Sequence, residues 1–282
     1  MVKTIIASDE QEFEKKKKSF VLGGKAKIHV LADFDRTITH GLDVEGKRTA
    51  TVISQLRSDS KYLGEDYAKE AHKLFDIYHP IEIDNNIPLK EKQRKMYEWW
   101  KRHFNLISEK GLTKDIIKQV VKEKPLRFRE GAKEFMNFLN ENDIPLVIMS
   151  AAPGDMIVEY LNKNNLMFSN IYVTSNLYEF DSNGKALRIK EPIIHTFNKT
   201  EISLKDTEVY DKIKNRRNVI LLGDSLGDVG MVEGSPHDNL IKVGFLNENI
   251  EENLENYKNN FDVLIMGDGD MNYVNGLLKK IQ

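Results

Sequence analysis

Five short apolar runs that end abruptly in polar residues constrain the fold of this chain more than any other feature of its sequence. Such runs are typical of strands buried on both faces of a parallel sheet. Stretches with the apolar spacing of helices separate them, and this alternation predicts an α/β fold whose parallel sheet is covered on both faces. The strands are expected at residues 28–32, 145–150, 218–224, 240–245 and 261–265, and the helices at 129–141, 154–164, 202–216, 250–259 and 271–281.

Residues 41–125 interrupt this alternation. The strand pattern stops there, and this stretch holds both tryptophans of the chain among many other aromatic residues. We therefore predict a helical domain inserted just after the first strand, with the α/β core formed by residues 1–40 and 126–282. The helices of the insert are expected at 44–58, 63–78, 89–104 and 113–123.

Two further segments, besides the predicted strands and helices above, have recognisable sequence patterns. An amphipathic helix is expected over residues 4–20. Its run Lys15–Lys18 is interpreted as a solvated helix face, and a role in nuclear targeting or nucleic-acid binding is the alternative. A turn signal at 181–184 predicts a small hairpin within residues 171–189.

Charge and composition exclude several classes of function. The chain carries 42 Lys and Arg against 44 Asp and Glu, and its net charge of −2 offers no bulk attraction to nucleic-acid polymers or anionic membranes. The absence of cysteine excludes disulfides, thiolate metal sites and cysteine nucleophiles. No apolar run approaches the roughly 20 residues of a membrane span. We expect a cytoplasmic monomer that acts on a small molecule.

Two acidic residues follow the first predicted strand of the core. Asp33 and Asp35 flank Phe34, so in an extended segment both carboxylates point the same way. They repel each other unless a cation or a proton lies between them. Such a pair can supply a nucleophile or metal ligand and a neighbouring general acid/base. The alternative is an ordinary acidic turn.

Three further clusters lie near the ends of predicted elements. Ser150 and the N–H of Ala151 can bind phosphate oxygens, although an N-cap serine has the same pattern. Lys199 precedes a helical run and can neutralise a phosphate or a facing aspartate, or it is one of many surface lysines. Asp224 and Asp228 share a glycine-containing turn that suits Mg²⁺, or the turn is merely capped by its aspartates.

These four clusters occur along the chain in an order that resembles the motif order of the haloacid dehalogenase-like superfamily of aspartate-nucleophile phosphatases. The resemblance implies a Rossmann-like α/β core with an inserted helical cap. Further runs are similar to the cytosolic pyrimidine 5′-nucleotidase family (cytosolic nucleotidase III), which includes members that act on 7-methylguanosine monophosphate. The similar runs are residues 33–37, 81–84, 97–100, 197–199 and 220–225.

The resemblance implies a Mg²⁺-dependent hydrolase of CMP, UMP and 7-methyl-GMP. Asp33 would attack phosphorus to form an aspartyl-phosphate, and Asp35 would be the general acid/base. Asp33, the backbone carbonyl of Asp35 and Asp224 would hold Mg²⁺. The resemblance assigns the remaining positions as follows: Ser150, the N–H of Ala151 and Lys199 to the phosphoryl oxygens, and Asp228 to support of the metal or of Lys199.

The insert would supply specificity for the base. Glu82 matches a family glutamate that faces the nucleobase, and a carboxylate accepts hydrogen bonds from amino and ring N–H groups. Trp100 matches a base-stacking position, while its neighbour Trp99 is expected in the core of the insert. His103 aligns with a further base- or ribose-contacting residue. The role of Arg36 stays open between substrate contact and solvent exposure.

Two other activities compete with or accompany this hypothesis. A phosphatase of the same superfamily could act on another small phosphomonoester, such as phosphoserine or a sugar phosphate. Phosphotransferase activity is a side reaction in which a nucleoside hydroxyl replaces water.

Overall fold

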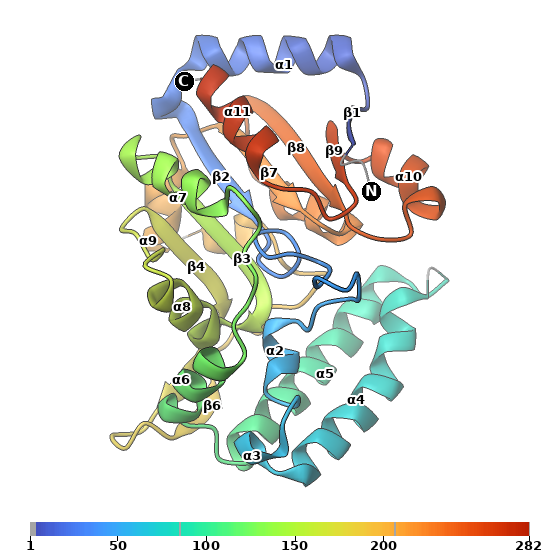
Figure 1. The fold of residues 1–282 in the computed structure, drawn as a ribbon, viewed down its shortest axis with the longest axis vertical. Helices are drawn as coiled ribbons and strands as arrows, with labels where there is room; N and C mark the ends of the chain where they lie inside the picture. Colours follow the sequence, from blue (N-terminus) through green and yellow to red (C-terminus); the bar gives the residue numbers. More distant parts are fainter. Residues whose placement is uncertain (1–3, 85, 206, 282) are drawn as a thin grey trace.

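A mostly parallel sheet forms the centre of the molecule (Figure 1). The computed structural model describes residues 4–84, 86–205 and 207–281. Within them, seven strands pair in the order β1-β9-β8-β7-β2-β3-β4, and only β1 is antiparallel to its neighbour. This confirms the predicted α/β class. The strands are β1 (Ile5–Ala7), β2 (Ile28–Ala32), β3 (Leu146–Pro153), β4 (Ile171–Asn176), β7 (Asn218–Gly223), β8 (Asn239–Leu246) and β9 (Val263–Met266).

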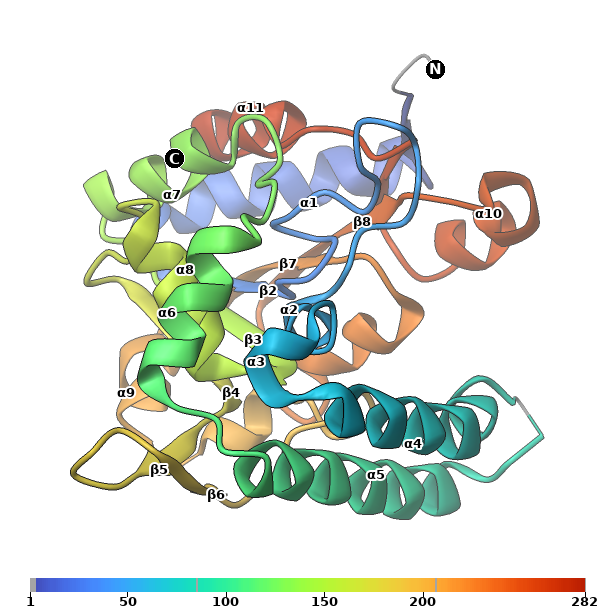
Figure 2. The same cartoon turned by 60° about the horizontal axis from the view of Figure 1, so that its bottom comes forward.

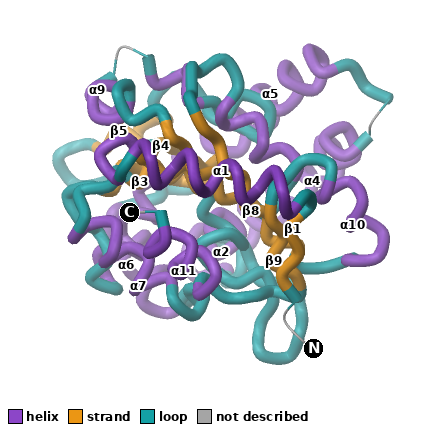
Figure 3. The backbone as a smooth tube through the Cα atoms, turned by 90° about the horizontal axis from the view of Figure 1, so that it is seen from above, coloured by secondary structure: helices purple, strands orange, loops and turns teal. Residues whose placement is uncertain are grey.

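Both faces of the sheet are buried, as the unbroken apolar runs predict. In β2, Ile28, Val30 and Ala32 pack into one apolar cluster, while Leu31 packs into a second cluster on the other face. Figure 3 shows the strands as an inner layer with helices around them. Helices α1 (Glu10–Gly23), α7 (Ala132–Glu141), α8 (Gly154–Lys163) and α11 (Asn272–Lys280) contribute to the first cluster, and α9 (Glu208–Ile213) and α10 (Ile250–Lys258) to the second.

The segment between β2 and α7 is helical and leaves the sheet. Helices α4 and α5 lie side by side at one end of the molecule (Figures 1 and 2). They bury a small aromatic cluster of their own around Tyr78, Met96 and Trp99. The helices of this segment are α2 (Val52–Gln55), α3 (Ser60–Leu63), α4 (Glu65–Ile83), α5 (Leu89–Glu109) and α6 (Lys114–Glu123).

The prediction of a helix over residues 44–58 is wrong for most of this range, because only Val52–Gln55 is helical within it. The Asp43 carboxylate accepts hydrogen bonds from the backbone N–H groups of Glu45 and Lys47, which closes a turn instead of a helix. Gly46 in that turn has a φ of 78°, a left-handed value that glycine adopts at little cost.

Two other predicted helices have different bounds. Residues Ile5–Ala7 form a strand, and α1 begins only after Asp9, whose side chain caps it by accepting from the N–H of Glu12. The helix expected over 202–216 is broken into a 3₁₀ turn at Glu201–Leu204 and α9, and Asp206 lies outside the described residues.

The remaining predictions concern the lysine run and the hairpin. The lysine run lies on α1, where Lys15 and Lys18 are exposed, while Lys16 bonds Asp262 at 2.7 Å and Lys15 and Lys17 pair with acids of the same helix. The hairpin forms between β5 (Tyr178–Phe180) and β6 (Ala186–Ile189). Within the part of the chain that the structure describes, no helix combines the length and apolar character needed to cross a bilayer.

Candidate active site

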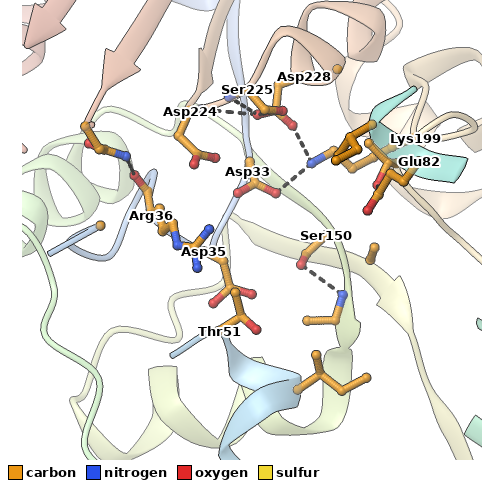
Figure 4. A pocket seen from close by; sticks show the side chains of 18 of the residues that line it. Asp33, Asp35, Arg36, Thr51, Glu82, Ser150, Lys199, Asp224, Ser225 and Asp228 are labelled. Carbon is orange, nitrogen blue, oxygen red and sulfur yellow. Dashed lines mark hydrogen bonds and ion pairs between the residues drawn. The ribbon is translucent and has the colours of Figure 1, made fainter. Parts of the chain in front are cut away.

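The candidate site lies at the carboxyl ends of the three central strands. Because β2 lies between β3 and β7, the residue after β2 is central, and Asp33 takes this place. Ligands of parallel α/β sheets bind at this edge. A cavity of about 720 Å³ opens here and extends to side chains of α4 and α5. Figure 4 shows residues that line this cavity, among them Asp33, Lys199 and Glu82.

A buried lysine links two of the predicted carboxylates. The Nζ atom of Lys199 lies 2.6 Å from Oδ1 of Asp33 and 2.7 Å from Oδ1 of Asp228, and Figure 4 shows both carboxylates directed at it. Burial lowers the pKa of Lys199, but Asp228 and Asp33 outweigh it and raise the pKa overall. Lys199 is therefore a fixed positive charge beside Asp33, which excludes the surface-lysine interpretation.

The turn after β7 holds Asp228 in place. Its Oδ2 accepts hydrogen bonds from the backbone N–H groups of Asp224 and Ser225, at 3.1 and 3.0 Å, and from the Ser225 hydroxyl at 2.9 Å. These bonds leave the other oxygen of Asp228 on Lys199. A Cβ on Gly223 would lie only 2.4 Å from Asp228, so the turn needs glycine at this position.

Asp33, Asp224 and Asp228 form a cluster that fits a divalent cation. Each offers an oxygen, and these oxygens lie within 4.8 Å of one another. Burial raises the pKa of Asp33 well above its usual range, and burial followed by the charge of Asp228 raises the pKa of Asp224 to about 7. Lys199 thus pairs with two of the three carboxylates and leaves Asp224 without an ion pair to it. Oxygen ligands with excess negative charge are what Mg²⁺ prefers.

Asp35 lies in a different environment from Asp33. Its Oδ1 accepts a 2.9 Å hydrogen bond from the N–H of Val52, the first residue of α2. Burial nevertheless raises the pKa of Asp35 to about 6. A carboxyl group with a pKa in this range exchanges protons readily near neutral pH, which suits a general acid/base.

Arg36 lines the cavity and does not simply extend into solvent. Its backbone is left-handed, with a φ of 62°, and its Nη2 donates to the carbonyl of Thr49 at 3.1 Å. The positive charge of Arg36 acts on both Asp35 and Asp224.

Ser150 lies within β3 and not at its end. The strand continues to Pro153, which is the N-cap of α8, so the interpretation of Ser150 as an N-cap is excluded. Its Oγ accepts from the N–H of Ala152 at 3.1 Å, and its carbonyl accepts from the hydroxyl of Ser175 at 2.8 Å. Ser150 and Ala151 both line the cavity beside Asp33.

The far end of the same cavity is aromatic. Trp99 is buried and stacks on Tyr78 with centroids 5.9 Å apart, as expected for a residue in the core of the insert. Trp100 stacks on Phe104 and on His103, at 5.4 and 6.3 Å. Trp99, Trp100 and His103 all border the cavity.

His103 and Glu82 each have a specific partner. His103 Nε2 lies 3.1 Å from the hydroxyl of Tyr67, and burial lowers the pKa of His103 to about 3, which keeps its ring neutral. Glu82 accepts a 2.7 Å hydrogen bond from the hydroxyl of Thr196. Sequence reasoning missed Thr196, which lines the cavity, and Tyr67, which contacts His103, because only the fold brings them to these partners.

Sequence reasoning also missed a buried polar network behind the site. Arg129, whose side chain is fully buried, donates to the carbonyl of Thr37 at 2.8 Å, to Asn247 at 2.7 Å and to Asp268 at 3.1 Å. Asp268 in turn accepts from the N–H of Gly41 at 2.7 Å. The network fixes the loop after Asp35 at the point where the inserted segment begins.

The fold of this chain is the one found in hydrolases of the haloacid dehalogenase type. The same fold occurs in a phosphoserine phosphohydrolase-like protein of Francisella tularensis (TM-score 0.53, 16% identity, 89% of this chain and 99% of that one). It also occurs in a HAD family hydrolase of Salmonella enterica (TM-score 0.59, 13% identity, 95% and 80% of the two chains). Likeness at this identity shows the fold alone.

The chain belongs to the pyrimidine 5′-nucleotidase (UMPH-1) family, whose sequence pattern matches residues 36–282. It is 36% identical to the 7-methylguanosine phosphate-specific 5′-nucleotidase A of Xenopus laevis, over 98% of this chain and 95% of the relative. The Homo sapiens enzyme of that name is 38% identical, over 92% and 86%. A crystal structure of cytosolic 5′-nucleotidase IIIB bound to cytidine matches with a TM-score of 0.89 at 32% identity, over 98% and 93% of the two chains. The chain is thus a phosphoric monoester hydrolase, a 5′-nucleotidase.

Proposed function

We propose that this chain is a Mg²⁺-dependent 5′-nucleotidase that hydrolyses CMP, UMP and 7-methyl-GMP to nucleoside and phosphate. The observation that carries the proposal is one continuous cavity that two unlike groups of residues line. Asp33 and Lys199 line it from the sheet side, and Glu82 and Trp100 line it from α4 and α5. The names of the relatives and the cytidine bound to the matching structure support this substrate class.

The first step is transfer of the phosphoryl group to Asp33. A carboxylate oxygen of Asp33 attacks phosphorus, the bond from phosphorus to the 5′ oxygen breaks, and Asp35 gives its proton to the leaving oxygen. Lys199, the Ser150 hydroxyl and the N–H of Ala151 donate hydrogen bonds to the phosphoryl oxygens. Such donors stabilise the charge that builds up in the transition state.

The second step regenerates the carboxylate. Water attacks the phosphorus of the aspartyl-phosphate, Asp35 takes a proton from that water, and the bond between phosphorus and Asp33 breaks to release phosphate. A nucleoside hydroxyl that replaced the water would give phosphotransfer. Mg²⁺ held by Asp33, Asp224 and the carbonyl of Asp35 would supply further neutralisation of phosphoryl charge, while Asp228 keeps Lys199 in position.

The base would lie between Trp100 and Glu82. A flat indole stacks on any nucleobase, and on a cationic 7-methylguanine ring it adds a cation–π attraction of about 0.5–2 kcal/mol. The Glu82 carboxylate would accept hydrogen bonds from amino or ring N–H groups of the base. His103, neutral and fixed by Tyr67, would contact the base or the ribose.

Residues 41–125 would act as a cap on the core formed by 1–40 and 126–282. The separate packing of α4 and α5 and the bond from Val52 to Asp35 support this division. Closure of the cap would exclude water while Asp33 is attacking. Slower hydrogen exchange at residues 40–42 and 124–128 with a phosphate analogue bound is the expected result, and identical exchange with and without it would contradict closure.

We also place the enzyme in the cytoplasm as a monomer, in line with the cytosolic name of the matching structure. Sedimentation at micromolar concentration is expected to give the mass of one chain. A concentration-dependent dimer would contradict the monomer.

A substrate panel tests the function. Phosphate release is measured for CMP, UMP, 7-methyl-GMP, GMP, AMP, phosphoserine and glucose 6-phosphate, each with Mg²⁺ and with EDTA. We expect Mg²⁺-dependent release from CMP, UMP and 7-methyl-GMP and far less from AMP. Release from phosphoserine or glucose 6-phosphate alone would instead favour a phosphatase for another small phosphomonoester, and would overturn the roles of Glu82 and Trp100.

A further inference from the structure

At the cavity, one hydrogen bond joins the inserted segment to a loop of the core. The hydroxyl of Thr196 donates to Oε1 of Glu82 at 2.7 Å. Glu82 lies near the end of α4, in the inserted segment, whereas Thr196 lies in the loop between β6 and the 3₁₀ turn at Glu201–Leu204. Lys199 follows Thr196 by three residues in this loop. The bond therefore connects the proposed base-binding carboxylate to the segment that carries the phosphate-binding lysine.

The loop around Thr196 is fixed from both sides. From the core, the side chain of Asn176 donates to the carbonyl of Ile194 and accepts from its N–H, each at 2.8 Å. From the insert, the Gln93 side chain donates to the carbonyl of Phe197 at 3.0 Å. The backbone on either side of Thr196 is therefore held, so its hydroxyl has a defined position.

The end of α4 is held to the same loop by a lysine. Lys92 is buried, its Nζ donates to the carbonyl of Glu82 at 2.9 Å, and its charge lies 5.4 Å from the centroid of the Phe197 ring. With the backbone of Glu82 held in this way, the freedom that remains lies in its three side-chain torsions. The last of these is broad in glutamate, whereas threonine is stiff at χ1. The Thr196 hydroxyl, by its bond to Oε1, therefore restricts where the Glu82 carboxylate lies.

We propose that Thr196 is a positioning residue for base specificity, which acts by orienting the Glu82 carboxylate toward the base. The proposal rests on the proposed function, because Glu82 discriminates bases only if the substrate is a nucleotide. An oriented carboxylate favours bases that present N–H donors at its free positions. Substrates without a base gain nothing from this orientation.

A purely structural role for Thr196 makes a different prediction. If the bond only fastened the insert to the core, its loss would affect all phosphomonoesters alike. If it orients Glu82, its loss affects nucleotides and spares p-nitrophenyl phosphate, which has no base. The informative quantity is therefore the ratio of kcat/KM for CMP, or for 7-methyl-GMP, to kcat/KM for p-nitrophenyl phosphate.

The test compares Thr196→Val, which removes the hydroxyl at nearly constant volume, with Thr196→Ser, which keeps it. We expect Thr196→Val to lower the ratio about tenfold, mostly through KM of the nucleotide, as expected for loss of an oriented hydrogen bond. Thr196→Ser should restore the ratio to within about threefold of the wild type. Thr200→Val is the matched control, because Thr200 lies on the same loop but borders a different cavity. Its ratio should equal that of the wild type.

The double variant tests whether Thr196 acts through Glu82. In a Glu82→Ala background, we expect Thr196→Val to leave the ratio where Glu82→Ala alone puts it. Thr196→Ala serves in the same comparisons if Thr196→Val fails to fold. An equal fall in both kcat/KM values, an unchanged ratio, or a further fall in the double variant would overturn the proposal. Wild-type enzyme that hydrolyses p-nitrophenyl phosphate but no nucleotide would overturn the proposed function itself.

Discussion

Replacement of Arg129 by methionine is expected to destabilise the fold strongly, although Arg129 is not part of the reaction. Its guanidinium is fully buried and donates to Asp268, to Asn247 and to the carbonyl of Thr37. It also donates to the carbonyls of Arg36 and Gly269. Methionine fills much of the same volume but satisfies none of these acceptors.

The expected loss of stability follows from the buried acceptors that lose their donor when Arg129 is replaced. Breaking a buried ion pair by removal of one partner costs about 3–5 kcal/mol, because the other charge stays buried. Here Asp268 keeps its bonds to His40 and to the N–H of Gly41, which reduces the cost. The unsatisfied carbonyls raise it again. We therefore expect the free energy of unfolding to fall by about 3–5 kcal/mol.

Urea unfolding followed by circular dichroism measures this change. Arg188→Met is the control, because Arg188 also pairs with a carboxylate, Glu179, but is mostly exposed. Its unfolding midpoint should match that of the wild type. Adding Asp268→Asn to Arg129→Met should recover part of the loss, since the orphaned charge is removed. Midpoints for Arg129→Met and Arg188→Met that coincide would refute the reasoning.

The remaining predictions concern the proposed nucleophile, the proposed metal site and the proposed base-stacking residue. Asp33→Asn should reduce phosphate release at least about a thousandfold by removing the nucleophile. The Tm should not fall, because Lys199 keeps its ion pair with Asp228 and the carboxylate that is lost is repelled by Asp228 and Asp224; turnover near that of the wild type would refute the role. Mg²⁺ should raise the Tm of the wild type by mass action, and Asp224→Asn should abolish that rise. An equal rise in both proteins would show that Asp224 does not bind the metal. Trp100→Ala should raise KM for CMP and 7-methyl-GMP at least about fivefold, since stacking on a base contributes about 1–3 kcal/mol, but should not raise KM for phosphoserine, which has no ring to stack.

The sheet and the proposed phosphate-binding residues were accessible from the sequence because each depends on local patterns. The run Ile28–Ala32 is apolar at every position, so it predicts a strand buried on both faces, and Asp33 directly follows it. The same reasoning places Asp224 after β7. Parallel strands end at one edge, so residues at those ends converge whatever their separation along the chain.

The parts that sequence reasoning missed depend on contacts across long separations. Arg129 meets Asp268 across 139 positions, and Thr196 meets Glu82 across 114. Nothing next to Arg129, Asp268 or Thr196 along the chain distinguishes it from a solvated polar residue. The prediction of a helix at 44–58 failed for another reason. The apolar spacing there is helical, but the Asp43 carboxylate accepts hydrogen bonds from the backbone two and four residues ahead, and these bonds form a turn instead.

The placement of the insert brings it into contact with the core at two points of the cavity. Because the inserted segment starts soon after Asp33 and Asp35, its first helix, α2, gives the N–H of Val52 to Asp35. Its later helices, α4 and α5, bring Glu82 and Gln93 to the Lys199 loop. The insert thus contacts the core at the proposed acid/base and again beside the proposed phosphate-binding lysine. A base that bonds Glu82 would act on the second contact, which lies three residues from Lys199, and this is a physical route from base binding to the proposed phosphate-binding residues.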